Sequence, residues 1–381
     1  MKKSIGFDGQ VMLEVLPTGI GTLAVETAKE AIKNPAFDFC ARIFSKDKKG
    51  VAAWLAKIGF RPEQIEYCTW FKRGVYLRAW HWIPIPYSHF FSQQTDVSVF
   101  WNYDIPPGVK GKTVVYVHDM TCMAYPETMD STVRRLLKWN LADTCKRADA
   151  IITLSAFSKS EIVRYMGVEE SKIHVIPCGI DQALFRPIND AKQVQNVCGK
   201  YGIQGDYFLY LGTLEPRKNI SLLLKAYKLL LARLGDKCPQ LVLAGKKGWQ
   251  FEQLDKELKD DALSGHLVLT DYVPREEIPS LMCGALAFVF PSLYEGFGLP
   301  PLEAMACGAP VIVSACASLP EVVGDAGIVV PVDAGALAEA MLRLFRDPDY
   351  REECAKKGIL QAGKFTWENA ARQLLEICDR L

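Results

Sequence analysis

Short apolar runs alternate with longer amphipathic stretches along most of this sequence, and no other feature constrains the fold as strongly. Repeats of strand and helix like these stack their helices on a largely parallel sheet. Two sets of repeats follow one another along the chain. The expected strands span residues 4–7, 113–118 and 150–154 in the first set, and 207–211, 241–244, 267–269, 287–291, 310–313 and 327–330 in the second. The sequence therefore predicts an α/β fold with two doubly wound domains.

Apolar residues at helical spacing predict the helices between these strands. They span residues 131–147, 156–166, 220–234, 274–283, 302–307 and 335–345, with another after Gly21. A connection containing Pro and Gly begins at residue 176, so we place the domain boundary near residue 186. We expect a first domain over residues 1–186, a second over 187–364, and a last helix in 365–381 that packs back on the first domain.

The charge balance and the cysteine content limit the kinds of ligand and metal that this chain is expected to bind. The chain has 45 Lys and Arg against 44 Asp and Glu, so its net charge of +1 gives no overall field to attract nucleic acid. A small anion would have to be bound by a local cluster of donors. The 12 cysteines are scattered and form no cluster with the five histidines, so we expect reduced thiols and no zinc site. An acid at Asp8 argues against a signal peptide, and a cytoplasmic protein is expected.

Residues 294–303 read Tyr-Glu-Gly-Phe-Gly-Leu-Pro-Pro-Leu-Glu and follow an expected strand. The glycines open the backbone, and the two prolines favour a helix start with Glu303 in its first turn. Free N–H groups and the positive helix end would then favour an anion. Ligands of open α/β sheets bind beyond the carboxyl ends of the strands. Glu295 and Glu303 are therefore expected to contact different parts of one ligand, although either alone is also typical of a cap or a solvated charge.

A second cluster, Gly212-Thr-Leu-Glu-Pro-Arg-Lys-Asn219, follows the expected strand 207–211. Arg217 and Lys218 are placed to neutralise a phosphate group, or else are solvated charges at a helix end. At an effective dielectric constant of ~20, a charge pair ~4 Å apart contributes about 4 kcal/mol. Two cations can therefore stabilise a departing diphosphate without a metal ion. Asp347-Pro348-Asp349 follows an amphipathic helix and is interpreted as a turn, so no metal is expected there.

The first domain carries weaker signals. Thr18-Gly19-Ile20-Gly21 precedes an expected helix, where it forms either a simple turn or a place for a ligand phosphate to approach the backbone. His118 ends the expected strand 113–118, which fits a buried structural histidine as well as a site residue.

Residues 68–107 are rich in aromatic and basic side chains. Such residues fit a core with a loop, and they also favour a membrane interface or a lipid-linked substrate. The set comprises Trp70, Lys72, Arg73, Tyr76, Arg78, Trp80, Trp82, Phe90, Phe91 and Trp101. Liposome flotation of a variant with Trp80 and Trp82 changed to Ala would test the membrane hypothesis.

Together these motifs resemble the retaining glycosyltransferases of family 4, which have the GT-B architecture of two Rossmann-like domains facing a cleft. The resemblance covers nearly the whole chain, and the segment 295–303 is its most specific part. It rests on residues 18–21, 117–119, 148–158, 175–181, 212–219 and 295–303. Among family members, the sequence is most similar to bacterial mannosyltransferases that build lipopolysaccharide O-antigen chains.

The resemblance implies transfer of a hexose with retention at the anomeric carbon and without a metal or other cofactor. The favoured donor is GDP-mannose, ahead of UDP-sugars, and the implied acceptor is a saccharide linked to polyprenyl diphosphate. It further implies a peripheral location on the inner face of the cell membrane, with contact through residues 68–107, and an assembly complex with other glycosyltransferases.

The resemblance also implies roles for single residues. Arg217 and Lys218 would hold the diphosphate, Glu295 would lie near the sugar hydroxyls, and His118 would lie against the far side of the sugar. The implied donor-binding residues are Glu303 for the ribose, Gly296, Phe297, Gly298 and Leu299 for the sugar and its phosphate, Gly19 and Gly21 near the phosphate, and Val273 beside the base. Thr213 stands where many members carry Arg, which makes phosphate binding more dependent on Arg217 and Lys218.

Several alternatives stay open at this point. In the favoured mechanism the departing phosphate oxygen takes the acceptor proton on the same face of the sugar, whereas in the rival one Glu295 acts as a covalent nucleophile. The chain is also compatible with a GT-B sugar-nucleotide epimerase or hydrolase, or with a non-catalytic sugar-nucleotide-binding scaffold. A nicotinamide enzyme fits less well, because Gly19-Ile20-Gly21 lacks the third glycine of that motif and a following acid.

Overall fold

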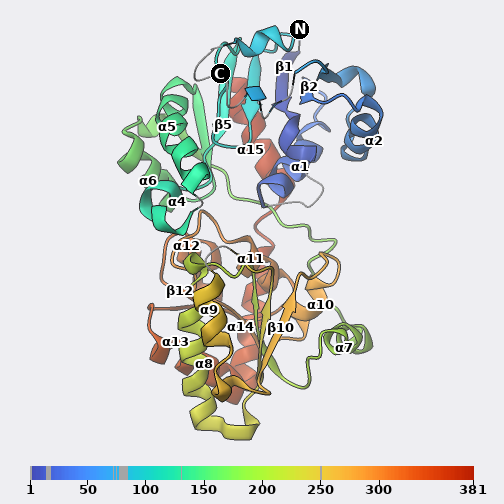
Figure 1. The fold of residues 1–381 in the computed structure, drawn as a ribbon. Coiled ribbons are helices and arrows are strands. Elements are labelled where there is room, and N and C mark those ends of the chain that lie inside the picture. Colours follow the sequence, from blue (N-terminus) through green and yellow to red (C-terminus); the bar gives the residue numbers. More distant parts are fainter. Residues whose placement is uncertain are drawn as a thin grey trace. The chain divides into compact units, whose positions relative to one another are not determined.

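The computed structural model describes residues 2–13, 19–71, 73, 75–76, 85–129, 131–248 and 251–381. The chain forms two compact units, each with its own parallel sheet (Figure 1). Unit 1 comprises Met1–Met123, Ser131–Gly179 and Thr366–Leu381, and unit 2 comprises Ala124–Asp130 and Ile180–Phe365. The prediction of two doubly wound α/β domains is confirmed.

Unit 1 contains a seven-stranded sheet in the order β3-β2-β1-β4-β5-β6-β7, with every described strand pair parallel. The strands are β1 (Lys3–Asp8), β2 (Phe37–Phe44), β3 (Ile65–Cys68), β4 (Val97–Phe100), β5 (Lys112–Tyr116), β6 (Ala150–Thr153) and β7 (Ile173–Val175). The helices are α1 (Gly19–Ala31), α2 (Lys48–Ile58), α4 (Thr121–Ala124), α5 (Ser131–Arg147), α6 (Ala156–Met166) and α15 (Trp367–Arg380). The strand order reverses between β1 and β4, where such sheets bind ligands.

Unit 2 contains a six-stranded parallel sheet in the order β10-β9-β8-β11-β12-β13. Its strands are β8 (Tyr207–Leu211), β9 (Gln240–Ala244), β10 (Leu267–Asp271), β11 (Ala287–Phe290), β12 (Val311–Ser314) and β13 (Ile328–Val330). Its helices are α7 (Ala191–Lys200), α8 (Ile220–Leu234), α9 (Phe251–Leu258), α10 (Ile278–Cys283), α11 (Leu299–Ala306), α12 (Leu319–Val323), α13 (Ala334–Arg346) and α14 (Pro348–Ala362). The switch point lies between β8 and β11.

The central strands of both sheets are buried on both faces, as expected for parallel sheets covered by helices. All four residues of β11 are buried, and Phe288 and Phe290 stack 5.9 Å apart. Both rings are fully buried, so the carboxyl end of β11 emerges from the core. The loops after β8 and β11 are therefore anchored on a rigid base.

Residues 124–130 already belong to unit 2, and the main passage from unit 1 to unit 2 lies at Gly179–Ile180, whereas the sequence places the boundary near residue 186. Ile180 and Phe185 are both buried, and the Arg275 guanidinium of unit 2 lies 5.2 Å from the centre of the Phe185 ring. The segment before residue 186 therefore packs as part of unit 2.

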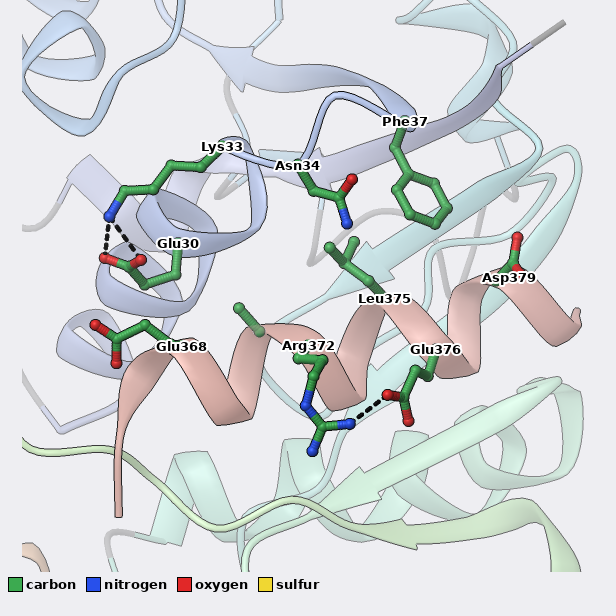
Figure 2. A pocket seen from close by; sticks show the side chains of 10 residues that line it. Glu30, Lys33, Asn34, Phe37, Glu368, Arg372, Leu375, Glu376 and Asp379 are labelled. Carbon is green, nitrogen blue, oxygen red and sulfur yellow. Dashed lines mark hydrogen bonds and ion pairs between the residues drawn. The ribbon is translucent and has the colours of Figure 1, made fainter. Parts of the chain in front are cut away.

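The last helix, α15, lies beside α1 in unit 1 (Figure 1). The Thr366 hydroxyl accepts from the Asn369 N–H at 3.1 Å and caps the helix N-terminus. A groove of about 500 Å³ lies beside α15. Figure 2 shows its lining side chains, among them the apolar Phe37 and Leu375. Its basic side chains pair with acids on their own segments, Lys33 with Glu30 and Arg372 with Glu376.

Candidate functional site

Two loops at the switch point of unit 2 bring the charged residues of the sequence motifs together. Arg217 and Lys218 lie in a 3-10 turn, Pro216–Lys218, after β8, and Glu295 lies in the loop after β11. The Leu293 N–H donates to the Arg217 carbonyl at 2.9 Å and joins the loops. Because β8 and β11 are parallel neighbours, both loops leave from the same edge of the sheet.

Glu295 is the centre of this cluster. Lys218 Nζ lies 2.5 Å from Glu295 Oε1, and an Arg217 terminal nitrogen lies 2.9 Å from Oε2. The Ser292 hydroxyl donates to Oε1 at 2.6 Å. Arg217 also pairs with Glu215 at 2.8 Å and donates to the Tyr294 carbonyl at 2.5 Å. Both carboxylate oxygens of Glu295 are thus engaged by cations.

Burial and charge act in opposite directions on this carboxyl group. Burial raises the pKa of Glu295, but the Lys218 and Arg217 charges outweigh it and hold the pKa at about 2. Burial lowers the pKa of Lys218, while Glu295 counters that effect. The side chains of Lys218 and Glu295 are only 12% and 11% exposed, so their charges are little screened by water. The cluster is a preformed, charged site of low dielectric.

The Gly296–Leu299 turn continues from this cluster into α11. The Ser318 hydroxyl donates to the carbonyls of Glu295 and Phe297 at 2.9 and 2.8 Å, which fixes the path of the loop. Gly298 has φ +113°, and a Cβ there would lie 2.9 Å from Leu319 Cδ2. Only glycine fits this position without strain.

The start of α11 differs from the sequence prediction. The helix begins at Leu299, three residues before the predicted start, because proline suits the first turn of a helix. Glu303 therefore falls in the second turn and not in the first. Pro300 and Pro301 have no N–H. The first turn of α11 therefore offers an anion fewer N–H donors than the sequence prediction implies. No side chain caps this helix end.

Glu303 has an environment opposite to that of Glu295. Burial raises the pKa of Glu303 to about 7; the charge of Arg275 lowers it, and that of Asp181 raises it. The nearest Arg275 nitrogen lies 3.9 Å from Glu303 Oε1, a weak ion pair. Glu303 is thus a buried carboxyl group that exchanges its proton near neutral pH. Val273, the remaining predicted donor residue of this unit, is buried just after β10.

Sequence reasoning missed the residues that support the charged ones. Ser292, Ser318 and Glu215 hold Glu295, its loop and Arg217, respectively. A single serine or glutamate has no spacing pattern that marks it. The only available signal was position, since Ser292 follows β11 directly and Glu215 precedes the Arg-Lys pair.

Unit 1 places His118 just beyond β5. His118 Nε2 donates to the Trp101 carbonyl at 2.7 Å, because a carbonyl oxygen can only accept. Burial lowers the pKa of His118, although the Trp101 carbonyl and Asp119 counter that shift. The imidazole is therefore neutral near pH 7, and the Tyr103 ring lies edge-on to it at 5.4 Å. Tyr103 has the unusual φ of +53°.

The glycines of the first motif lie in a different element from the one expected. Gly19 and Gly21 belong to the first turn of α1 and not to a loop before it, and Thr18 lies outside the described residues. Sequence reasoning also missed the ion pair of Arg73 and Asp8, 2.9 Å long, at the carboxyl end of β1.

Part of the aromatic segment 68–107 is core. Tyr76, Phe90, Phe91 and Trp101 are buried, which agrees with the interpretation of a core with a loop for these four residues. Their rings pack around Phe44 of β2 and the neighbouring sheet. Trp70 is 60% exposed. Lys72, Arg78, Trp80 and Trp82 lie outside the described residues.

Within the described ranges, no group of three His, Cys, Asp or Glu side chains is arranged to hold a metal ion. Asp347 of the D-x-D triplet caps α14, accepting from the Tyr350 N–H at 2.9 Å. Among the described helices, none combines the length and apolar character needed to cross a membrane.

Two family models match parts of this chain. The model of Glycosyltransferase Family 4 matches residues 75–184, and that of Glycosyl transferases group 1 matches residues 200–361. O-antigen chain mannosyltransferase B of Escherichia coli is 38% identical over 279 residues, which are 72% of this chain and 71% of that protein. The E. coli serotype-specific mannosyltransferase WbdA is 32% identical over 277 residues, 72% of this chain but only 34% of that longer protein.

Solved structures resemble the whole chain. The Anabaena HepE complex with UDP-glucose has a TM-score of 0.74 at 18% identity and covers 100% of both chains. WaaG, a glycosyltransferase involved in lipopolysaccharide biosynthesis, has a TM-score of 0.71 at 16% identity and covers 98% of this chain and 99% of its own. At such low identity these structures show the fold alone. The chain therefore belongs to the family 4 glycosyltransferases and has the two Rossmann-like domains of the GT-B fold.

Proposed function

We propose that this glycosyltransferase moves mannose from GDP-mannose, with retention of the α configuration, onto a lipid-linked saccharide in O-antigen or lipopolysaccharide synthesis. The observation that carries the proposal is the buried cluster of Arg217, Lys218 and Glu295 at the switch point of unit 2. The choice of mannose and O-antigen rests on the E. coli relatives named above.

The two cations suit a reaction in which a diphosphate departs. The bond between the anomeric carbon and the phosphate oxygen breaks, and negative charge grows on the leaving group. Arg217 and Lys218 are held in place by Glu295 before any donor arrives, so little reorganisation is needed as that charge develops. These cations supply the charge stabilisation that a metal ion supplies in other transferases. A metal-independent reaction is therefore part of the proposal.

Retention follows if the acceptor attacks from the side on which the phosphate leaves. The acceptor hydroxyl forms the new bond to the anomeric carbon, and its proton passes to the departing phosphate oxygen. Both oxygens of Glu295 are engaged by cations, and its low pKa makes it a weak nucleophile. This geometry favours an electrostatic role for Glu295 over a covalent one. A mannosyl adduct trapped on Glu295 would favour the rival mechanism.

The remaining site residues keep the roles given by the family resemblance. Glu303 binds the ribose hydroxyls, the Gly296–Leu299 turn binds the sugar and its phosphate, and Val273 lies beside the base. In unit 1, neutral His118 binds sugar hydroxyls, while Gly19 and Gly21 approach the phosphate. The acceptor is linked to polyprenyl diphosphate, and the protein works at the inner face of the cell membrane in a complex with other glycosyltransferases. The contact proposed for the membrane consists of Trp70, Trp80 and Trp82 in segment 68–107.

A panel of nucleotide sugars tests the donor. A ligand that binds only the folded state at 100 times its Kd stabilises it by about 2.7 kcal/mol, so GDP-mannose should raise the melting temperature more than UDP-glucose or UDP-galactose. Transfer to an acceptor should give an α-linked product by NMR. Release of nucleotide that does not depend on acceptor would indicate a hydrolase or epimerase, and binding without turnover would indicate a scaffold.

A further inference from the structure

A separate cavity lies on unit 1, between α5 and the loop that joins β4 to β5. Its volume is about 420 Å³, within the range of roughly 300–1,000 Å³ typical of small-molecule sites. The loop contributes Pro107 and Gly108, and α5 contributes Trp139, Asp143 and Arg147. None of these residues belongs to the proposed catalytic machinery.

Trp139 is the most unusual member of this lining. It is 65% exposed, more than Trp54 at 40%, and it stands on a helix of a folded domain. A large aromatic ring left open to water beside a cavity is typical of a recognition surface, because it offers apolar area at little conformational cost. The ring face is a platform on which an apolar face of a ligand can stack.

Hydrogen bonds hold the Arg147 side chain in place at the polar side of the cavity. Arg147 donates through Nε to Asp143 Oδ2 at 2.6 Å and through its terminal nitrogens to the carbonyls of Ile105 and Pro106 at 2.7 and 3.3 Å. These bonds use three of the five guanidinium N–H groups and hold the side chain rigidly. Among the described residues, Asp143 Oδ1 takes no hydrogen bond. Asp143 Oδ1 and the remaining N–H groups of Arg147 are thus available to a ligand beside the ring.

Charge selects among the ligand classes. Asp143 and Arg147 neutralise each other, so the lining offers no excess charge to a phosphate or a nucleotide. A purely apolar ligand would form no hydrogen bonds with Asp143 or Arg147. A neutral pyranose fits, because its ring face is apolar and its neighbouring hydroxyls both donate and accept hydrogen bonds.

We propose that this cavity, the α5 pocket, binds a neutral pyranose unit of a saccharide chain through stacking on Trp139 and hydrogen bonds to Asp143 and Arg147. The identity of the chain as acceptor or product rests on the proposed function. A second contact point raises the affinity for long chains without changing the chemical step, because it makes the second binding event intramolecular.

Calorimetric titration without any donor tests binding directly. The probes are α-linked mannotetraose and gluco- and galacto-tetrasaccharides, titrated into the parent, Trp139→Ala, Trp139→Phe and Asp143→Asn proteins. We expect Trp139→Ala to weaken binding of one probe by about tenfold or more. Trp139→Phe, which keeps an aromatic face, should lose less, and Trp54→Ala should bind as the parent does. Thermal melts establish that each variant is folded.

Three results would overturn the proposal. The parent could bind none of the probes, or Trp139→Ala could bind them as well as the parent. In the third, Trp139 would be required for binding to phosphatidylglycerol vesicles and not to sugars, which would make the helix a membrane contact. If no donor is turned over but Trp139-dependent sugar binding persists, the proposed function fails while the α5 pocket stands. With an active enzyme, Trp139→Ala should raise KM for long acceptors and leave kcat and the KM for GDP-mannose unchanged.

Discussion

The two units build different chemistry on the same scaffold. Sheet order runs β3-β2-β1-β4-β5-β6 in unit 1, before its extra β7, and β10-β9-β8-β11-β12-β13 in unit 2, so their switch points correspond. Unit 2 gathers two cations on one buried carboxylate there. Unit 1 has the ion pair of Arg73 and Asp8 at the end of β1, and a neutral His118 against a backbone carbonyl.

This difference shows that the topology fixes where a ligand binds, while a few loop residues decide which charges it meets. In unit 2 both cations come from one short turn whose position is set by β8. In unit 1 the equivalent strand ends carry one ion pair, Arg73 with Asp8, beside aromatic rings such as Trp101 and Tyr103. We therefore propose that unit 2 carries the charge-dependent part of the reaction.

The largest expected effect is on turnover when a cation of unit 2 is removed. Lys218→Ala and Arg217→Ala should each lower kcat by about 10²–10³, the cost of losing one donor to a developing anion. Steady-state assays with GDP-mannose measure it. Lys225→Ala, an exposed lysine on α8, is the matched control and should keep the parent rate. Parent-like turnover by a folded Lys218→Ala or Arg217→Ala protein would refute the leaving-group role.

Glu295→Gln should lower the free energy of unfolding by about 3 kcal/mol at pH 7, since it leaves buried cations without their carboxylate. The charges of Lys218 and Arg217 overcome burial and depress the folded pKa from 4.5 to about 2. The stability gained is present above pH 4.5 and is lost as pH falls toward 2. Urea unfolding at pH 7 and at pH 3 measures it, and the gap between parent and variant should shrink at the lower pH. A gap independent of pH would contradict this account.

Glu303 should respond to pH with the opposite sign. Burial raises its folded pKa from 4.5 to about 7, so the folded state binds this proton more tightly than the unfolded chain. Stability of the parent should fall as pH rises from 4.5 to 7. Glu303→Gln should lack that loss and be more stable at pH 8 by up to about 3 kcal/mol, measured by the same urea titrations. A destabilised Glu303→Gln at pH 8 would show that the carboxylate is satisfied in a way that this geometry lacks.

The two units also differ in how many of their strands could be predicted from the sequence. All six strands of unit 2 were predicted, because each contains a short apolar run, and β8, β9, β11 and β12 are also largely buried. In unit 1, β1, β5 and β6 were predicted, but β2, β3, β4 and β7 were missed. β2 illustrates the physical reason, because it carries a buried Arg42 that interrupts its apolar pattern.

Arg42 is buried beside hydrogen-bond partners that are distant in sequence. Its guanidinium donates to the hydroxyls of Ser98 and Thr95 at 2.9 and 3.0 Å and to the Gln93 carbonyl at 2.8 Å. No pattern in the sequence around Arg42 indicates these contacts. The candidate site behaves in the same way, since its charged motif residues were identified from the sequence while the serines that hold them were not. The predicted start of α11 was wrong, because Pro300 and Pro301 lie within the first turn of the helix and not before it.

The smallest expected effect concerns His118, and it sharpens the contrast between the units. Burial, the first cause of its lowered pKa, should keep the imidazole neutral across pH 6.5–8, with the proton on Nε2 facing the Trp101 carbonyl. NMR of nitrogen-labelled histidine reports both the tautomer and the titration. His118→Gln keeps a donor for that carbonyl and should cost about 1 kcal/mol or less in the free energy of unfolding. A His118 that becomes protonated above pH 7 would place a switchable charge in unit 1, and the assignment of charge chemistry to unit 2 alone would then fail.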